Sequence, residues 1–206
     1  MIEELRMYRV RSGGLAEYLR LAAEVQMPIR GDRHGQLLGF WHAEVGAANS
    51  VLNLWRHEGL DRRQELRDQL GAIKAWQTDY LAKVWPLMEE QVIRLMEPII
   101  AFRAPTGTHV YEVRFIRTKV GQARALANAL LEDAPDAFRE STASLSLTMA
   151  GHLNEVVHIG AHDNLNQRAH LSLAHPQWQG FFDRHGDKVA EIKSSLLLPA
   201  AHSPAQ

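Results

Sequence analysis

The sequence Glu-Leu-Arg-Met-Tyr at residues 4–8 returns 108 residues later as Glu-Val-Arg-Phe-Ile at residues 112–116. A glycine follows each stretch at the same spacing, Gly13 in the first and Gly121 in the second. Further matches continue in the same order at slowly shrinking offsets, among them Asn49 with Asn154, Leu60 with Leu165 and Trp76 with Trp178. A repeat of about 100 residues has the size of a domain, so the sequence predicts a duplicated domain.

The composition is ordinary for a globular protein, with 206 residues of which 23% are charged and 46% are apolar. The formal net charge is -1, so no bulk charge attracts nucleic acid or an anionic membrane. The chain has no cysteine, which excludes disulfides and thiolate chemistry and suits a reducing compartment. We see no signal peptide and no membrane-spanning apolar run. We therefore expect a cytoplasmic protein with no nucleic-acid partner and no membrane insertion.

Each half is predicted to contain strand, helix, strand, strand, helix and strand, which is the order of a ferredoxin-like unit. In the first half, alternation and helical spacing predict strands at 2–11, 37–45, 51–57 and 91–99, with helical regions at 15–25 and 61–84. In the second half they predict strands at 109–118, 144–150, 154–162 and 189–198, with helices at 122–134 and 164–185. The predicted domains are residues 1–103 and 104–206, and the end of the chain from Pro199 is predicted to fray.

The strand predicted at 51–57 carries apolar residues on both faces, which gives a reason for two ferredoxin-like units to pack together. A ferredoxin-like unit covers one face of its sheet with two helices and leaves the other face to be covered by a partner. Neither face of this strand is simply polar, because Leu52 and Leu54 lie on one face and Trp55 lies on the other. We therefore predict an α+β fold in which the two sheets pack face to face as a barrel within one chain, with helices outside. The alternative of two independent domains is disfavoured by a linker of about five residues.

The first half also carries Gly-Phe-Trp at 39–41, Val-Leu-Asn-Leu-Trp-Arg-His at 51–57 and Lys-Val-Trp-Pro-Leu at 83–87. Together with the opening motif, these stretches resemble the NIPSNAP domain of the dimeric α+β-barrel superfamily. The second half looks like a diverged copy, with Ile-Gly-Ala-His at 159–162 in place of Leu-Trp-Arg-His at 54–57. The resemblance implies the barrel fold and brings no settled activity with it.

Polar and aromatic side chains gather on one predicted face of the first sheet. Alternation places Glu4, Arg6 and Tyr8 on one face of the first strand. The other members of the predicted set are Asn53, Trp55 and His57 on the third strand and Arg94 on the fourth. We predict that this face looks into the barrel and forms a pocket.

The residue types suggest a role for each member of this pocket. Arginine pairs with carboxylates in a bidentate manner, tryptophan supplies an apolar wall, and histidine transfers protons near neutral pH. We predict ligand binding by Arg6, Asn53, Trp55 and Arg94, and catalysis by His57 and Tyr8. An alternative remains open, in which Glu4 and Arg6 only pair across the sheet interface and lock the two halves together.

The function predicted on this basis is the binding of a small organic molecule, anionic or aromatic, with cofactor-independent catalysis left open. The alternatives are a non-catalytic structural or interaction protein and a haem-binding or monooxygenase-type barrel protein. We predict neither a metal site nor a cofactor, since His158 and His162 lie roughly 13 Å apart along a strand. A homodimer of the tandem chain also stays open. The second half replaces Tyr8 with Ile116 and Arg94 with Ser195, which favours one pocket and one structural lid.

Overall fold

Eight antiparallel strands close into one barrel in the computed structural model, which describes residues 1–206. Their order around the barrel is β1-β3-β2-β8-β5-β7-β6-β4, so each half supplies four neighbouring strands. The strands are β1 (Ile2–Val10), β2 (Gln36–Val45), β3 (Ser50–His57), β4 (Met88–Ile100), β5 (Val110–Thr118), β6 (Thr142–Ala150), β7 (Glu155–His162) and β8 (Val189–Pro199). The predicted intramolecular α+β barrel is confirmed, and every predicted strand is present with its ends shifted by three residues or fewer.

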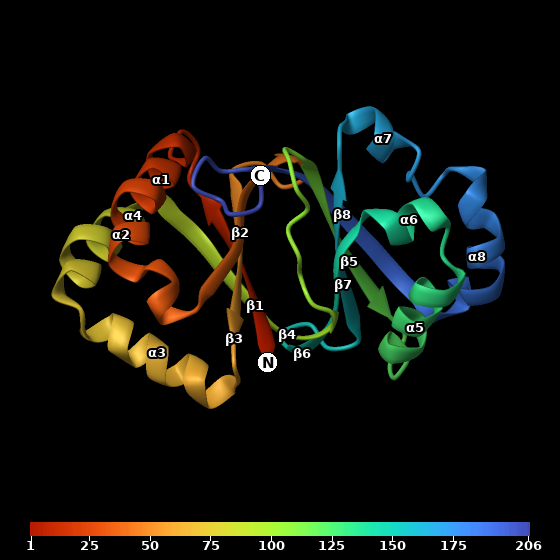
Figure 1. Cartoon of the computed structure of the whole chain (residues 1–206), viewed down its shortest axis with the longest axis horizontal. Helices are drawn as coiled ribbons and strands as arrows, with labels where there is room; N and C mark the ends of the chain where they lie inside the picture. Colours follow the sequence, from red (N-terminus) through yellow and green to blue (C-terminus); the bar gives the residue numbers. More distant parts are fainter.

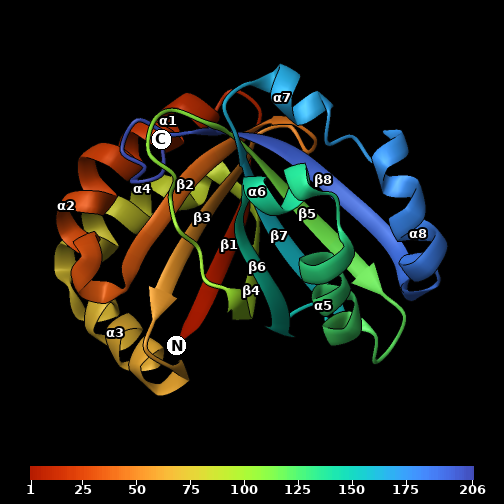
Figure 2. The same ribbon diagram turned by 45° about the vertical axis from the view of Figure 1, so that its right-hand side comes forward.

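The helices form two outer layers on opposite sides of the strands (Figure 1), and the turned view shows the same separation (Figure 2). The first layer contains α1 (Leu15–Leu21), η1 (Ala22–Gln26), α2 (Met27–Arg30), η2 (Gly31–His34), α3 (Leu60–Ala72), η3 (Trp76–Leu81), α4 (Ala82–Val84) and η4 (Trp85–Leu87). The second contains α5 (Ala123–Asp133), α6 (Asp136–Ser141), α7 (Leu165–Ala169), η5 (Pro176–Trp178), α8 (Gln179–His185) and η6 (Gly186–Lys188). Helix α6 was not predicted, because six residues are too few to establish a helical period. None of the helices is both long enough and apolar enough to cross a bilayer.

The barrel interior is filled by apolar side chains from both halves. Leu5, Leu52, Leu54 and Met96 of the first half belong to the same buried cluster as Val113, Val157, Ile159 and Leu197 of the second. Trp41 is fully buried in this cluster, with its ring 5.3 Å from that of Tyr111. The shared core explains why the two halves are held together as one barrel.

The matching asparagines of the two halves lie in corresponding hairpin turns. Asn49 and Asn154 adopt left-handed backbone conformations with φ of 58° and 57°. Their carbonyl oxygens accept hydrogen bonds from the backbone N–H groups of Val10 at 2.9 Å and Thr118 at 2.8 Å. Each asparagine therefore ties the hairpin turn between two strands to the end of the first strand of its half.

The end of the chain does not fray as predicted but packs against the barrel. The Ser203 hydroxyl accepts a hydrogen bond from the Phe40 backbone N–H at 2.9 Å. Ala205 is fully buried within the barrel core cluster. The small, polar composition of this segment is therefore that of a close-packed cover rather than of a loose tail.

Gly39 is expected to be required for the position of Trp41. A Cβ atom at residue 39 would overlap the indole ring of Trp41, so Gly39→Ala forces that ring to move within the packed interior. We expect a loss of about 1–3 kcal/mol of unfolding free energy, measured by urea denaturation. As a control, Gly71→Ala in α3 places its Cβ in open space and should leave stability equal or slightly higher. Equal stability of the two variants would contradict this prediction.

Candidate functional site

The predicted polar face of β1 lies toward the helices rather than toward the barrel interior. Strand register pairs Arg6 with Asn53 and Glu4 with Trp55, which confirms that these residues share one face. The prediction that this face looks inward is wrong, because the interior is occupied by the opposite face, which carries Leu5. Both faces of these strands are buried, one by the other half and one by helices, so alternation alone does not distinguish them.

Arg94 does not join the predicted pocket. It lies opposite Leu5 in the register of β4 with β1 and therefore shares the inward face of Leu5. Its guanidinium donates to both carboxylate oxygens of Glu155 in the second half, Nε to Oε1 at 2.6 Å and Nη2 to Oε2 at 3.2 Å. Arg94 is thus a locking residue between the halves, a role that the sequence had suggested for Glu4 and Arg6.

A cavity of about 290 Å³ lies between the outer face of the first sheet and its helical layer. Its lining includes Arg6, Tyr8, Arg30, Arg67, Trp76 and Tyr80. Arg6 and Tyr8 come from β1, Arg30 ends α2, and Arg67 lies in α3. Trp85 also borders the cavity and is 59% exposed, which places it on the solvent side.

Two π-helical segments border this cavity. Segment η1 contributes Gln26, and segment η3 contributes Trp76 and Tyr80. The Tyr80 hydroxyl donates a 2.8 Å hydrogen bond to Gln26 Oε1 and so joins the two segments. π-Helical turns are rare and are frequent at functional sites. The second half contains none, so this irregularity accompanies the cavity.

Arg6 is the cavity arginine that has an acidic partner. Its guanidinium contacts the Glu4 carboxylate and the Tyr8 hydroxyl. Burial opposes the charge of Arg6, but Tyr8 and Glu4 outweigh burial and raise its pKa. Burial likewise opposes the charge of Glu4, but His57, Arg63 and Arg6 lower the pKa of Glu4 well below its usual range. Glu4 is therefore a buried carboxylate shared among several cations.

Arg30 and Arg67 have no carboxylate partner. Arg30 is 3% exposed, and its guanidinium carbon lies 3.3 Å from the ring centroid of Trp55. Its Nη2 donates to the His34 carbonyl oxygen at 3.2 Å, whereas its Nε has no partner. Burial, followed by repulsion from Arg6, lowers the pKa of Arg30 to about 9 and also lowers the pKa of Arg67. The two guanidiniums thus have no negatively charged side chain of the protein beside them to balance their charge.

The remaining predicted residues surround the cavity without lining it. The Trp55 indole donates to Asn53 Oδ1 at 2.6 Å, which fixes the ring beneath Arg30. His57 lies behind Glu4, with its Nε2 3.3 Å from Glu4 Oε2, close in distance but outside hydrogen-bond geometry. Of the two predicted catalytic residues, only Tyr8 lines the cavity. Sequence reasoning missed Arg30 and Arg67, since mixed charges at 61–68 are typical of a solvated helix face.

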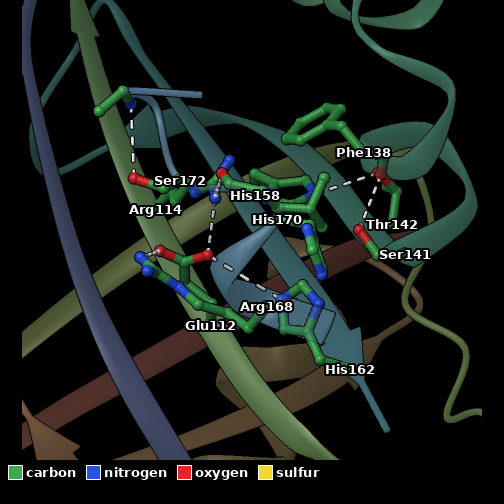
Figure 3. A network of polar contacts seen from close by, with 12 residues as sticks. Glu112, Arg114, Phe138, Ser141, Thr142, His158, His162, Arg168, His170 and Ser172 are labelled. Carbon is green, nitrogen blue, oxygen red and sulfur yellow. Dashed lines mark hydrogen bonds and ion pairs between the residues drawn. The ribbon is translucent and has the colours of Figure 1, made fainter. Parts of the chain in front are cut away.

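The second half repeats the cluster around Glu4. In Figure 3 the Glu112 carboxylate lies between Arg114 and Arg168, each of which donates to it at 2.7 Å. His162 Nε2 is 3.9 Å from Glu112 Oε2. We call these residues the Glu112 quartet (Glu112, Arg114, His162, Arg168) and their counterparts the Glu4 quartet (Glu4, Arg6, His57, Arg63). A cluster present in both halves accounts for stability and does not by itself mark a site.

The cavity, in contrast, is not repeated. The space beside Arg114 is only about 10 Å³ and is lined mainly by apolar side chains. Counted at the offset of 108 residues, Arg30 and Tyr8 correspond to Phe138 and Ile116, and counted at the offset of 105 residues, Arg67 corresponds to Ser172. The Phe138 ring lies 5.7 Å from the Arg114 guanidinium carbon and helps to close the space. Beside the arginine on the first strand of each half, an open cavity bordered by arginines without carboxylates therefore occurs in the first half and not in the second.

Comparison with known proteins finds relatives of this chain. The NIPSNAP family model matches residues 3–102. Protein NipSnap homolog 3A of Homo sapiens is 25% identical, over 98% of this chain and 84% of its own length. The NipSnap homolog of Dictyostelium discoideum is 22% identical, over 96% of this chain and 87% of its own.

A solved structure shares the whole barrel. It is a Fusobacterium nucleatum protein described as a proposed monooxygenase, with a TM-score of 0.69 over 97% of this chain and 92% of its own. At 12% identity this likeness shows the fold alone. The matched domain and the relatives aligned along nearly the whole chain lead to one assignment: this chain belongs to the NIPSNAP family.

Proposed function

We propose that this protein binds a small organic anion in the cavity of its first half. The observation that carries the proposal is that Arg6, Arg30 and Arg67 border one cavity while Glu4 is the only carboxylate engaged with any of them. Glu4 is also shared with Arg63, at 2.8 Å from Arg63 Nε to Glu4 Oε2. A cavity of about 290 Å³ lies at the small end of the range for ligand sites.

The walls of the cavity suit a flat or aromatic ligand body. The rings of Trp76 and Tyr80 lie 4.7 Å apart with an interplanar angle of 35° and offer an apolar surface. Arg30 and Arg67 offer planar guanidinium groups, which bind carboxylate or phosphate oxygens through two parallel hydrogen bonds. A ligand with an anionic group at one end and an aromatic group at the other therefore matches this lining.

Catalysis in this cavity would depend on Tyr8. Its hydroxyl borders the cavity and contacts Arg6 Nε, which places it within reach of a molecule bound there. His57 acts at a distance, as a neighbour of Glu4. The monooxygenase-type alternative gains only the fold from the Fusobacterium nucleatum protein. A purely structural role accounts for the two quartets and for the stacking of Arg30 on Trp55, but it leaves the charge of Arg30 without a carboxylate.

The proposal treats the two halves as ferredoxin-like repeats, residues 1–103 and 104–206, descended from one unit. The matching order of strands and the two quartets support this division. In the second repeat the site has been filled, so that the repeat serves to close the barrel. Pairing of two such chains through their outer surfaces stays a prediction.

Replacing Arg30 by methionine is expected to separate binding from stability. Arg30→Met keeps an apolar stem over Trp55 and removes a buried charge that repels Arg6, so unfolding free energy should stay equal or rise. Its affinity for benzoate, measured by isothermal titration calorimetry, should fall by about tenfold or more. Benzyl alcohol, the neutral analogue, should bind the wild-type protein more weakly than benzoate.

Arg114→Met is the matched control in the second half. It breaks a buried ion pair, so it should lower stability and leave benzoate affinity unchanged. The proposal fails if benzoate binds no better than benzyl alcohol, or if Arg30→Met keeps the full affinity for benzoate.

A further inference from the structure

The cavity is bordered by more positive charge than one negative charge can balance. Arg6 is compensated by Glu4, which leaves Arg30 and Arg67 without a carboxylate. The acidic residues of the surrounding elements are engaged elsewhere. Asp68 accepts from Gln64 at 2.8 Å, Glu24 pairs with Arg20, and Glu90 pairs with Arg9. No side chain of the protein therefore completes this pair of cations.

Burial makes each of these cations costly on its own. A charge removed from water needs its own partner, because its solvation is lost and attraction to a distant ion does not replace it. Arg30 is almost completely buried, and its Nε has no hydrogen-bond partner. Arg67 is half-buried on the facing helix α3 and borders the same cavity. One anionic group with a single charge would leave the site with a net positive charge.

We infer that the natural ligand of this cavity is a small dianion, with both negative charges close together, as in a dicarboxylate or a phosphate monoester. This inference rests on the proposed function and specifies its ligand class. The two charges must lie close together because Arg30 and Arg67 border one small cavity of about 290 Å³. Trp76 and Tyr80 receive the remainder of the molecule, so a short aromatic or apolar body fits better than a second polar arm.

The second half, which has no such cavity, also differs from the first at the two unpaired arginines. At the same offsets in the sequence, Phe138 and Ser172 stand where the first half has Arg30 and Arg67, while Arg114 keeps its own carboxylate, Glu112. Arg114 Nη2 also donates to the Leu171 carbonyl oxygen at 2.9 Å, so this nitrogen has two acceptors within the protein. The half without this cavity thus also lacks both unpaired arginines, while it contains the paired arginine.

The test compares ligands of one shape and different charge on the intact protein at pH 8. Phthalate is compared with monomethyl phthalate, and phenyl phosphate with methyl phenyl phosphate; a phosphate monoester is a dianion at this pH. We expect each dianion to bind about 10- to 100-fold more tightly than its monoanionic partner, by calorimetry. In Arg67→Gln the dianions should lose more affinity than the monoanions, so that this ratio falls toward one. Arg62→Gln, a surface arginine of the same helix that pairs with Glu65, should keep the wild-type ratio.

The outcomes distinguish this inference from the proposed function on which it rests. Equal affinity for monoanions and dianions would overturn the inference that the ligand is a dianion, while the proposed anion site would remain. An unchanged ratio in Arg67→Gln also overturns it. Failure of every anion to bind better than benzyl alcohol overturns the proposed function itself.

Discussion

Glu4→Gln is expected to lower the free energy of unfolding by about 3–5 kcal/mol, the usual cost of removing one partner from a buried ion cluster. Glu4 is completely buried, and its carboxylate contacts Arg6 and Arg63. The amide keeps the shape of the side chain but leaves two guanidiniums without their negative charge. Urea denaturation followed by circular dichroism measures the loss, provided that the slope with denaturant stays that of the wild type.

Two further variants make this result specific. Glu112→Gln removes the corresponding carboxylate of the Glu112 quartet and should cost a similar amount, since Arg114 and Arg168 depend on it. Glu24→Gln removes one end of an exposed ion pair with Arg20, which keeps Glu17 as a second partner. That change should stay within about 0.5 kcal/mol of the wild type. A loss below about 1 kcal/mol for Glu4→Gln would show that the quartet contributes little to the fold.

The strands and the barrel could be predicted because they depend on local patterns. Alternation in β1 and β3 is regular, and Trp55 on the face opposite Leu54 shows that both faces are covered. The sequence could not predict which face of these strands meets the barrel interior and which meets the helices. Both faces are buried, so both carry apolar side chains and alternation does not distinguish them. The placement of Arg94 failed for a related reason: its face depends on the register of β4 with β1, which only the folded sheet defines.

The sequence predicted only those residues of the site that lie on a strand. Arg6 and Tyr8 stand at alternating positions of β1, which the sequence displays directly. Arg30 and Arg67 reach the same cavity from two helices that are distant in sequence, and their approach depends on how those helices pack. The π-helical turn that contains Gln26 has no sequence signature distinct from an ordinary helix. The half of the site on helices therefore became visible only in the structure.

Acidification from pH 7.5 to 5 is expected to destabilise the protein through histidines of the second half. His158 is buried against the Phe138 ring, 4.2 Å between centroids, and its Nε2 lies 3.0 Å from Thr142 Oγ1. Burial, followed by the charge of Arg114, lowers the pKa of His158 well below its usual value. Burial, only partly offset by the Glu112 carboxylate, lowers the pKa of His162 to about 4. Both side chains are therefore neutral in the folded protein near neutral pH.

The sign of the effect follows from comparing the folded and unfolded states. In the unfolded chain these histidines have a pKa of about 6.5, so below that pH the unfolded state binds protons that the folded state does not. Stability is fully present above about pH 6.5 and falls with pH until His162 titrates in the folded state near pH 4. Glu4 and Glu112 have lowered pKa values, so their contribution is lost only at lower pH and adds no slope in this range.

His162 alone is expected to remove about 2 kcal/mol of unfolding free energy between pH 7.5 and 5, and His158 acts in the same direction. The measurement is a series of urea denaturation curves across this range. In His162→Gln the unfolding free energy should change less with pH than in the wild type, because glutamine does not titrate. This holds whatever the substitution does to stability at pH 7.5. His152→Gln, at an exposed turn, should keep the wild-type slope. A wild-type stability that does not change over this range, or a His162→Gln variant with the full slope, would contradict this prediction, because it would mean that His162 binds its proton over the same pH range in the folded and unfolded states.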